Sequence, residues 1–151
     1  MIFKNKYRKS VFMVAYFFEQ NKIKYLVLKR KLHWKGFEFP KGGIEKGESK
    51  IEAVKREIFE ETGLNAKKIK NHHKQGKWDY KNSVKGRPGM KGQSWKLFSV
   101  EVESKNVKID PREHVSFEWL DYESALKKLT FENQRKCLQI VNDWLEKSGR
   151  N

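Results

Sequence analysis

Cysteine is nearly absent from this sequence of 151 residues, in which Cys137 is the single example. One cysteine excludes an internal disulfide and a metal site built from several thiolates. Cys137 lies where apolar residues recur at helical spacing, so packing in a hydrophobic core is its expected role. Any metal site is therefore expected to use other ligands.

Long hydrophobic runs are also missing. The run VFMVAYFF, residues 11–18, is too short to span a bilayer. It follows a basic N-terminus and superficially resembles a signal peptide. However, Glu19 and Gln20 come directly after it, with no small-residue cleavage site. We expect a buried strand here, a cytosolic (cytoplasmic) protein and no membrane partner.

Acidic residues are scarce relative to basic ones, with 19 against 34 and a formal net charge of +15. Such a surplus creates a positive field that attracts polyanions such as nucleotides or RNA. Lysine is spread along the whole chain, however, and a composition bias that only aids solubility explains the surplus equally well. The length and the 37% hydrophobic content predict a single globular domain over residues 1–151.

The first half of the sequence predicts two strands followed by a loop. Residues 10–18 and 24–30 are rich in β-branched and aromatic residues and are separated by a polar turn. Residues 33–43 contain one proline and three glycines, which predicts a loop.

A helix is expected directly after this loop. Ser49 followed by Glu52 forms a capping-box pattern, and Gly63 is suited to terminate the helix after Thr62. The rest of the chain predicts strands at 67–80, 94–102 and 115–121, a flexible tip at 81–92, and helices at 123–129 and 131–147. Strands interleaved with helices predict the α/β class, with a mixed sheet between helices.

The segment 42–64, GGIEKGESKIEAVKREIFEETGL, concentrates carboxylates in a basic chain. Its acidic residues are Glu45, Glu48, Glu52, Glu57, Glu60 and Glu61. On a helix, Glu57, Glu60 and Glu61 share one face, because they stand at positions i, i+3 and i+4. The apolar residues Ile51, Val54 and Ile58 form a separate stripe that can pack on a sheet.

Carboxylates grouped on one helix face repel one another unless a cation lies among them. Oxygen ligands of this kind suit a hard ion such as Mg²⁺ or Mn²⁺. Arg56 precedes Glu60 by four residues and can form a salt bridge with it. The alternative is a solvated acidic face, which is common for charge clusters.

The same segment resembles the Nudix box in every defined position. The matching residues are Gly42, Glu48, Arg56, Glu57, Ile58, Glu60, Glu61, Gly63 and Leu64. The resemblance implies the Nudix fold, an α/β/α sandwich with a mixed β-sheet, and hydrolysis of a nucleoside diphosphate linked to another group. It also implies that Glu60 and Glu61 bind a divalent metal, that Glu57 is a further ligand or a base, and that the Gly42 carbonyl joins them.

Motifs outside the box are similar to two Nudix subfamilies. FPKGGIEKGE, 39–48, is similar to the entry of diadenosine polyphosphate hydrolases and RNA 5′-pyrophosphohydrolases, which implies that Lys41 contacts phosphate. GQSWKLFSVEV, 92–102, loosely matches a strand of the same groups. Phe37 departs from the pattern, because those families often carry tryptophan there.

The C-terminal part, 110–139, resembles animal-type diadenosine tetraphosphate hydrolases. The matching residues are Glu113, His114, Trp119 and Phe131. Glu113 is then a candidate catalytic carboxylate from outside the box, or else a surface residue. Trp119 and Phe131 either stack on a base or belong to the core, and His114 alone would be a hydrogen-bonded loop residue.

Aromatic and basic residues also gather around the expected tip. Trp78 and Tyr80 could stack on a purine, while Lys85, Arg87 and Lys91 hold phosphates. The two aromatic residues could equally be strand residues that face the core.

Three functions follow, in order of expectation. The first is metal-dependent hydrolysis of diadenosine tetraphosphate to ATP and AMP, with Mg²⁺ or Mn²⁺ as the cofactor. The second is removal of pyrophosphate from 5′-triphosphate RNA, which the basic composition favours. The third belongs to another class, a non-catalytic nucleotide- or RNA-binding Nudix module. The sequence leaves the oligomeric state open.

Overall fold

The computed structural model describes residues 6–31, 35–80 and 89–148 of the chain. Its strands are β1 (Lys6–Glu19), β2 (Lys22–Arg30), β3 (Gly36–Glu38), β4 (Lys41–Gly43), β5 (Ala66–Asp79), β6 (Met90–Val102) and β7 (His114–Leu120). Its helices are α1 (Lys50–Thr62), α2 (Tyr122–Lys128) and α3 (Glu132–Ser148). In these parts of the chain, no helix combines the length and the apolar character that crossing a membrane requires.

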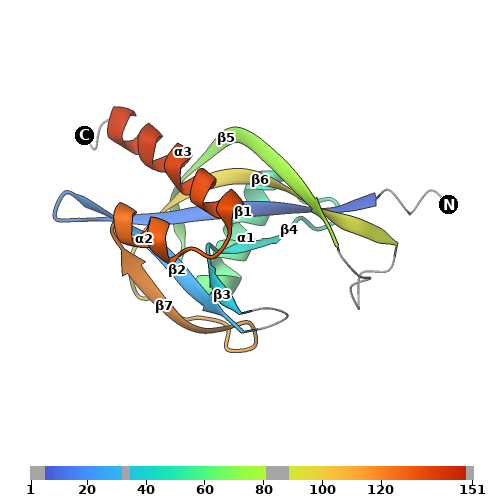
Figure 1. Cartoon of the computed structure of the whole chain (residues 1–151), viewed down its shortest axis with the longest axis horizontal. Helices are drawn as coiled ribbons and strands as arrows, with labels where there is room; N and C mark the ends of the chain where they lie inside the picture. Colours follow the sequence, from blue (N-terminus) through green and yellow to red (C-terminus); the bar gives the residue numbers. More distant parts are fainter. Residues whose placement is uncertain (1–5, 32–34, 81–88, 149–151) are drawn as a thin grey trace.

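The strands form one mixed sheet, as the sequence predicted (Figure 1). Its order is β3-β2-β1-β6-β5, while β4 also pairs with β1 and β7 with β2. The long β1 and β6 run parallel to each other, and the other pairs are antiparallel. Since β1 pairs with β2, β4 and β6, it forms the centre of the sheet.

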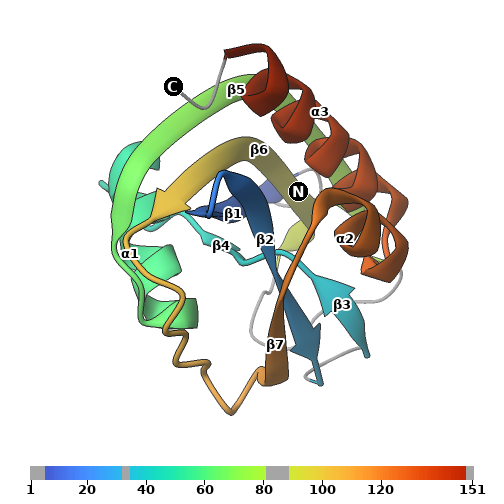
Figure 2. The ribbon, with the colours of Figure 1, turned by 90° about the vertical axis from the view of Figure 1, so that its left-hand side faces the viewer.

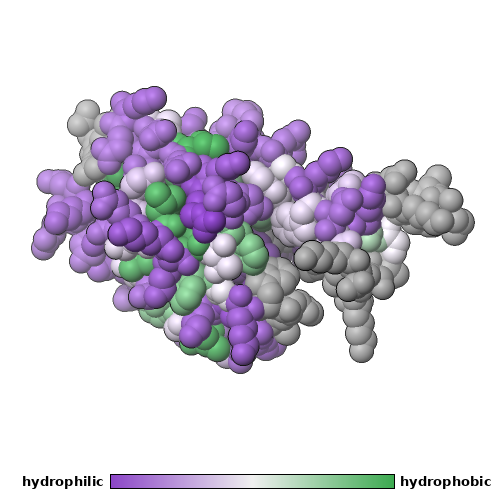
Figure 3. Space-filling model, viewed as in Figure 1, coloured by the Kyte–Doolittle hydropathy of each residue, from purple (hydrophilic) through white to green (hydrophobic). Residues whose placement is uncertain are grey.

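Alternate residues of β1 pack on opposite faces of the sheet. Phe12, Val14 and Tyr16 belong to a core that α2 and α3 cover, and this core includes the buried Cys137. Val11, Met13 and Ala15 belong to a second core that α1 covers. Helices on both faces make the α/β/α sandwich (Figure 2), so the predicted fold class is confirmed. Hydrophilic residues cover much of the face shown in Figure 3, with smaller apolar patches among them.

Helix α1 begins and ends as its sequence predicts. The Ser49 side chain accepts a hydrogen bond from the Glu52 N–H, and the Glu52 carboxylate accepts one from the Ser49 N–H. Gly63 ends the helix with φ 72°, a left-handed conformation that glycine adopts without steric cost. The expected apolar stripe is only partly right, because Ile51 is 41% exposed while Val54 and Ile58 are buried.

Two expectations about local structure were wrong. The expected loop 33–43 contains the short strands β3 and β4, which pair with β2 and β1. The strand β6 begins at Met90, inside the expected tip 81–92, because it pairs in parallel with β1 from Lys6 onward. The strand predicted over 67–80 exists as β5, with an irregularity between Asn71 and Gln75.

Candidate active site

The acidic face of α1 is turned toward β4, and Gly42 allows the close approach. A Cβ atom added to Gly42 would collide with the carboxyl carbon of Glu57. The adjacent Lys41 N–H donates a hydrogen bond of 2.7 Å to Oε1 of Glu61. The glycine strand therefore fixes two of the box carboxylates against its backbone.

Glu61 is the most deeply buried carboxylate of the helix, with 4% of its surface exposed. Burial raises its pKa well above the ordinary value, because an ionised carboxylate loses its hydration. The hydrogen bond from Lys41 opposes this rise, while nearby Glu113 and Glu38 add to it. A carboxylate held in this way favours either a proton or a bound cation.

Glu113 comes from outside the box and lies beside Glu61. Ligand atoms of Glu61, Glu113 and His114 lie within 4.8 Å of one another, although they come from α1 and the start of β7. The backbone carbonyl of Glu113 accepts a hydrogen bond of 2.9 Å from the Lys31 N–H. The structure thus brings Glu113 to the carboxylates, as the resemblance implied, and its catalytic role stays a prediction.

Arg56 holds the other glutamates together. Its guanidinium donates to Glu57 at 2.7 Å, to Glu60 at 3.1 Å and to the Gly43 carbonyl at 2.8 Å. It also donates twice to Glu48, at 2.7 and 2.9 Å, which lowers the pKa of that carboxyl to about 2. The expected Arg56–Glu60 salt bridge is present, and it is one part of a larger network.

Glu57 and Glu60 differ in their exposure. Burial raises the pKa of Glu57, and the hydrogen bond from Arg56 offsets part of this rise. The Glu60 side chain is 56% exposed and lies at the solvent-facing side of the carboxylate group. The three box glutamates therefore share one helix face and extend from the interior to the solvent.

Glu38 was not predicted, because its segment was expected to be a loop. It lies on β3, is 1% exposed, and accepts hydrogen bonds of 2.9 Å from His114 Nε2–H and from the Arg30 guanidinium. Burial alone would raise its pKa, but the His114 hydrogen bond and the charges of Lys41 and Arg30 lower it. His114 is thus a buried partner of Glu38, and its Nδ1 lies 3.9 Å from Glu61 Oε2.

The donor set fits a divalent cation. Glu61 and Glu113 offer oxygen atoms, which Mg²⁺ and Mn²⁺ prefer, and Glu57 and Glu60 lie on the same helix as Glu61. Among the described residues, Glu38 Oε1 and His114 Nδ1 are buried side-chain atoms without a hydrogen-bond partner. Buried polar atoms are normally satisfied, and Glu38 Oε1 keeps an ion pair with Lys41 at 3.7 Å, so these two atoms offer further polar contacts beside the carboxylates.

The predicted substrate-binding residues are brought together only in part. The Lys41 ammonium lies 5.7 Å from the Trp78 ring centre and 3.7 Å from Glu38 Oε1. Trp78 is half-buried and packs 5.9 Å from Phe12, so it also belongs to the core. The Tyr80 hydroxyl donates to Gln93 at 3.3 Å.

The remaining predicted residues lie elsewhere. Phe131 precedes α3 and its carbonyl accepts hydrogen bonds from the first turn of that helix. Trp119 packs against the α1-side core and donates to the Lys105 carbonyl. Lys91 lies beside Asp79, at 3.8 Å. Lys85 and Arg87 lie outside the described residues.

Replacing Gly42 by alanine should separate activity from stability. The new methyl group must displace the Glu57 carboxylate, so we expect turnover to fall by about tenfold or more. Melting temperature should change little, because the displaced atoms are the end of a flexible side chain. Steady-state kinetics and thermal unfolding measure the two effects.

Gly47→Ala is the matched control for Gly42→Ala. Gly47 has φ 81°, and among the described residues no atom beyond its two chain neighbours lies within 4 Å of an added Cβ. Alanine there should lower stability by about 1 kcal/mol through backbone strain, with turnover intact. Normal turnover in Gly42→Ala would show that the Glu57 position is not critical.

Comparison with known families agrees with this geometry. The fold is an α/β/α sandwich in which one helix carries a group of carboxylates that can hold a divalent cation. The sequence profile of the NUDIX domain matches residues 6–139. The chain therefore belongs to the Nudix family and is a Nudix-type pyrophosphohydrolase; members of this family generally use a divalent metal.

Individual relatives extend the comparison. The chain is 30% identical to an RNA pyrophosphohydrolase of Ruthia magnifica subsp. Calyptogena magnifica, over 93% of this chain and 86% of the relative. It is 32% identical to an RNA pyrophosphohydrolase of Bartonella clarridgeiae, over 72% of this chain and 69% of the relative. Its fold is similar to that of a C. elegans Ap4A hydrolase in a binary complex, with a TM-score of 0.76 and 21% sequence identity. The match covers 93% of this chain and 98% of the hydrolase chain.

Proposed function

We propose that this enzyme removes pyrophosphate from the 5′-triphosphate end of RNA. The observation that carries the proposal is the 30% identity, over 93% of the chain, to a relative that is an RNA pyrophosphohydrolase. The net charge of +15 supports it, because each lysine–phosphate contact with RNA releases counterions. This is the second of the functions expected from the sequence.

The proposed roles follow from the positions of the side chains. Glu60 and Glu61 would hold the divalent cation, together with Glu113 and the carbonyl of Gly42, and Glu57 would be either a further ligand or the general base. When bound, the cation neutralises phosphate oxygens and acidifies the attacking water.

The neighbouring side chains would bind phosphate and accept the proton. The Lys41 ammonium, beside Glu38 and the Trp78 ring, is placed to contact phosphate. The raised pKa of Glu57 suits a general base, because such a carboxylate accepts a proton more readily than an exposed one. Arg56 keeps this carboxylate oriented.

Hydrolysis of diadenosine tetraphosphate to ATP and AMP is the second candidate. It is favoured by the Glu113–His114 pair, which lies at the carboxylate cluster and matches the motif of animal-type diadenosine tetraphosphate hydrolases. A non-catalytic module receives no support, because the family is one of hydrolases and the complete set of box carboxylates is present.

One substrate panel decides between the two enzymes. Purified protein with Mg²⁺ is given 5′-triphosphate RNA, diadenosine tetraphosphate, ADP-ribose and nucleoside triphosphates, with Glu61→Gln as the inactive control. We expect release of phosphate or pyrophosphate from RNA at the highest kcat/KM. If ATP and AMP form from the dinucleotide far more efficiently than any product from RNA, the second candidate is correct.

A further inference from the structure

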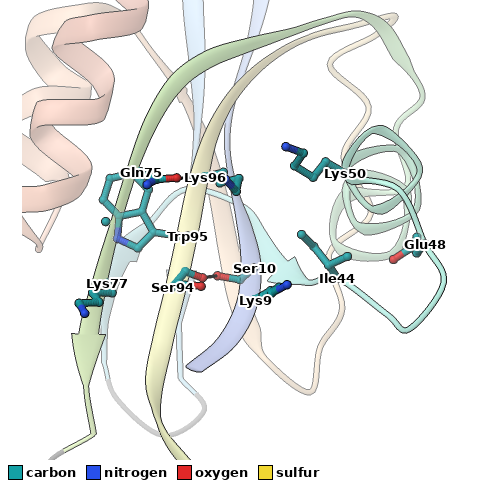
Figure 4. A pocket seen from close by; sticks show the side chains of 11 residues that line it. Lys9, Ser10, Ile44, Glu48, Lys50, Gln75, Lys77, Ser94, Trp95 and Lys96 are labelled. Atoms are coloured by element: carbon teal, nitrogen blue, oxygen red, sulfur yellow. Dashed lines mark hydrogen bonds between the residues drawn. The ribbon is translucent and has the colours of Figure 1, made fainter. Parts of the chain in front are cut away.

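A lysine-lined groove lies beside α1, on the face of the sheet that this helix covers. Its volume is about 820 Å³, and it opens between the N-terminal turn of α1 and the adjoining parts of β1, β5 and β6 (Figure 4). Lys50 stands on the helix side, while Lys9, Lys77 and Lys96 stand on the strands. Lys41 and Trp78 are not among its lining residues.

The strand register explains why the lysines gather here. Lys9 pairs with Ser94, and Val11 pairs with Lys96, in the parallel ladder of β1 and β6. Side chains alternate along a strand, so Lys9 and Lys96 share the face of Val11, which packs in the α1-side core. Lys77 pairs with Ser94 from the other side. The helix begins at Lys50, so this end of the sheet face is polar and forms the floor of the groove.

The charge in the groove is strongly unbalanced. Four lysines line it, and Glu48 is the one acid among its lining residues. The Glu48 carboxylate already accepts two hydrogen bonds from Arg56, so its charge is engaged away from the lysines. Lys96 donates to Gln75 at 3.0 Å, and Lys77 lies 4.8 Å from the Tyr7 ring centre. Over the described ranges, Lys9 and Lys50 form no ion pair, which leaves them available to an anionic ligand.

The groove also adjoins the catalytic carboxylates. Glu48 lines the groove, and the Arg56 guanidinium bridges it to Glu57 at 2.7 Å on each side. The N-terminus of α1 adds its partial positive charge at the same place. A polyanion that reaches the carboxylates can therefore continue into the groove without meeting an unpaired acid among the groove's lining residues.

We propose that this groove binds the phosphodiester backbone of single-stranded RNA, at nucleotides beyond the 5′ end being hydrolysed. The proposal rests on the RNA function proposed above. Lysines contact phosphates without reading the bases, so the groove would add affinity for long RNA and no sequence preference. It would distinguish RNA chains from nucleotides, which are too short to occupy both sites.

Binding to RNA tests the groove apart from hydrolysis. The probe is a labelled single strand of about 20 nucleotides with a 5′-hydroxyl end, measured by fluorescence anisotropy against salt. We expect Lys9→Gln/Lys50→Gln to bind it about tenfold more weakly and to lower the slope of log K against log salt by about 1.4, which is about 0.7 for each lost contact. Unchanged affinity and slope would overturn the proposal.

The matched control removes the same charge from the opposite face. Lys127→Gln/Lys147→Gln lies on α2 and α3, where both lysines are exposed. An equal loss of RNA affinity in this control would mean that only net charge matters, which would also overturn the proposal. Loss of tripolyphosphate binding with RNA binding retained in the groove variant would assign the groove to free polyphosphate instead. Thermal unfolding confirms that each variant is folded.

A kinetic measurement separates the groove from the proposed function. We expect the ratio of kcat/KM for a 5′-triphosphate strand of about 20 nucleotides to that for a triphosphate dinucleotide to fall by about tenfold in the groove variant. A constant ratio would contradict the groove. The wild-type protein could bind RNA without hydrolysing it. If, in that case, the groove variant loses RNA binding and the control variant keeps it, the proposed function fails and the RNA site stands.

Discussion

Glu61→Gln should lower kcat/KM by at least about a hundredfold while the folded structure is kept. The substitution is nearly isosteric, but it removes the buried carboxylate on which the proposed metal site depends. The amide oxygen can still accept the hydrogen bond from the Lys41 N–H, so the backbone of β4 keeps its partner. Steady-state kinetics on the preferred substrate, with saturating Mg²⁺, measures the effect.

Glu52→Gln is the matched control for this variant. It makes the same chemical change on the same helix, and glutamine also forms a capping box. We expect its turnover to equal that of the wild type. Wild-type turnover in Glu61→Gln itself would remove Glu61 from the metal site.

The stability of the metal-free protein gives an independent readout of Glu61. Its pKa is raised in the folded state, so the folded protein binds this proton more tightly than the unfolded chain does. The stability that Glu61 contributes is therefore present below its ordinary pKa of 4.5 and is lost as pH rises through the folded value. Metal-free Glu61→Gln should melt above the wild type at neutral pH, and this advantage should shrink toward pH 4.5.

Added cation should reverse the order of the two proteins. A ligand that binds only the folded state raises the melting temperature, and the effect requires an intact site. Mg²⁺ or Mn²⁺ should therefore stabilise the wild type and have little effect on Glu61→Gln. Equal stabilisation of both proteins would place the cation elsewhere.

The sequence predicted α1 and its carboxylates well because the signals are local. The capping box Ser49–Glu52 and the terminal Gly63 lie within the helix or next to it, and the i, i+3, i+4 spacing alone places the glutamates on one face. Glu113 was found only through the resemblance, since nothing in its own neighbourhood marks it as close to Glu61.

The partners of Glu38 depend on long-range pairing. His114 lies 76 residues from Glu38, and the two meet because β3 and β7 both pair with β2. A strand of three residues carries too little periodicity to be recognised, so β3 was expected to be a loop. The lysine-lined groove could not be predicted from the sequence either, because it depends on the β1–β6 register and on where α1 begins.

Glu38→Gln should destabilise the protein by about 3 kcal/mol, since a buried ion pair would be left half intact. The Arg30 and Glu38 side chains are 8% and 1% exposed, so little water can reach the Arg30 guanidinium to solvate it after the carboxylate is removed. Lys41 lies 3.7 Å from the same carboxylate and would lose this contact as well. Urea unfolding at neutral pH measures the loss.

Glu118→Gln removes a carboxylate from an exposed ion pair with Lys128, at 3.4 Å, and should cost less than about 1 kcal/mol. Equal losses of unfolding free energy in Glu38→Gln and Glu118→Gln would refute the view that burial makes the Glu38 ion pairs important for stability.

The pH dependence of Glu38 has the opposite sign to that of Glu61, although both glutamates are buried in one site. The pKa of Glu38 is lowered in the folded state, so its contribution is present above the ordinary value of 4.5 and is lost as pH falls through the folded value. The difference in unfolding free energy between the wild type and Glu38→Gln should therefore be full at pH 7 and shrink below pH 4.5. A difference that grows in acid would mean that His114, Lys41 and Arg30 do not hold Glu38 ionised. Side chains of the protein hold Glu38 ionised, whereas the charge of Glu61 is the one that a bound cation is proposed to balance.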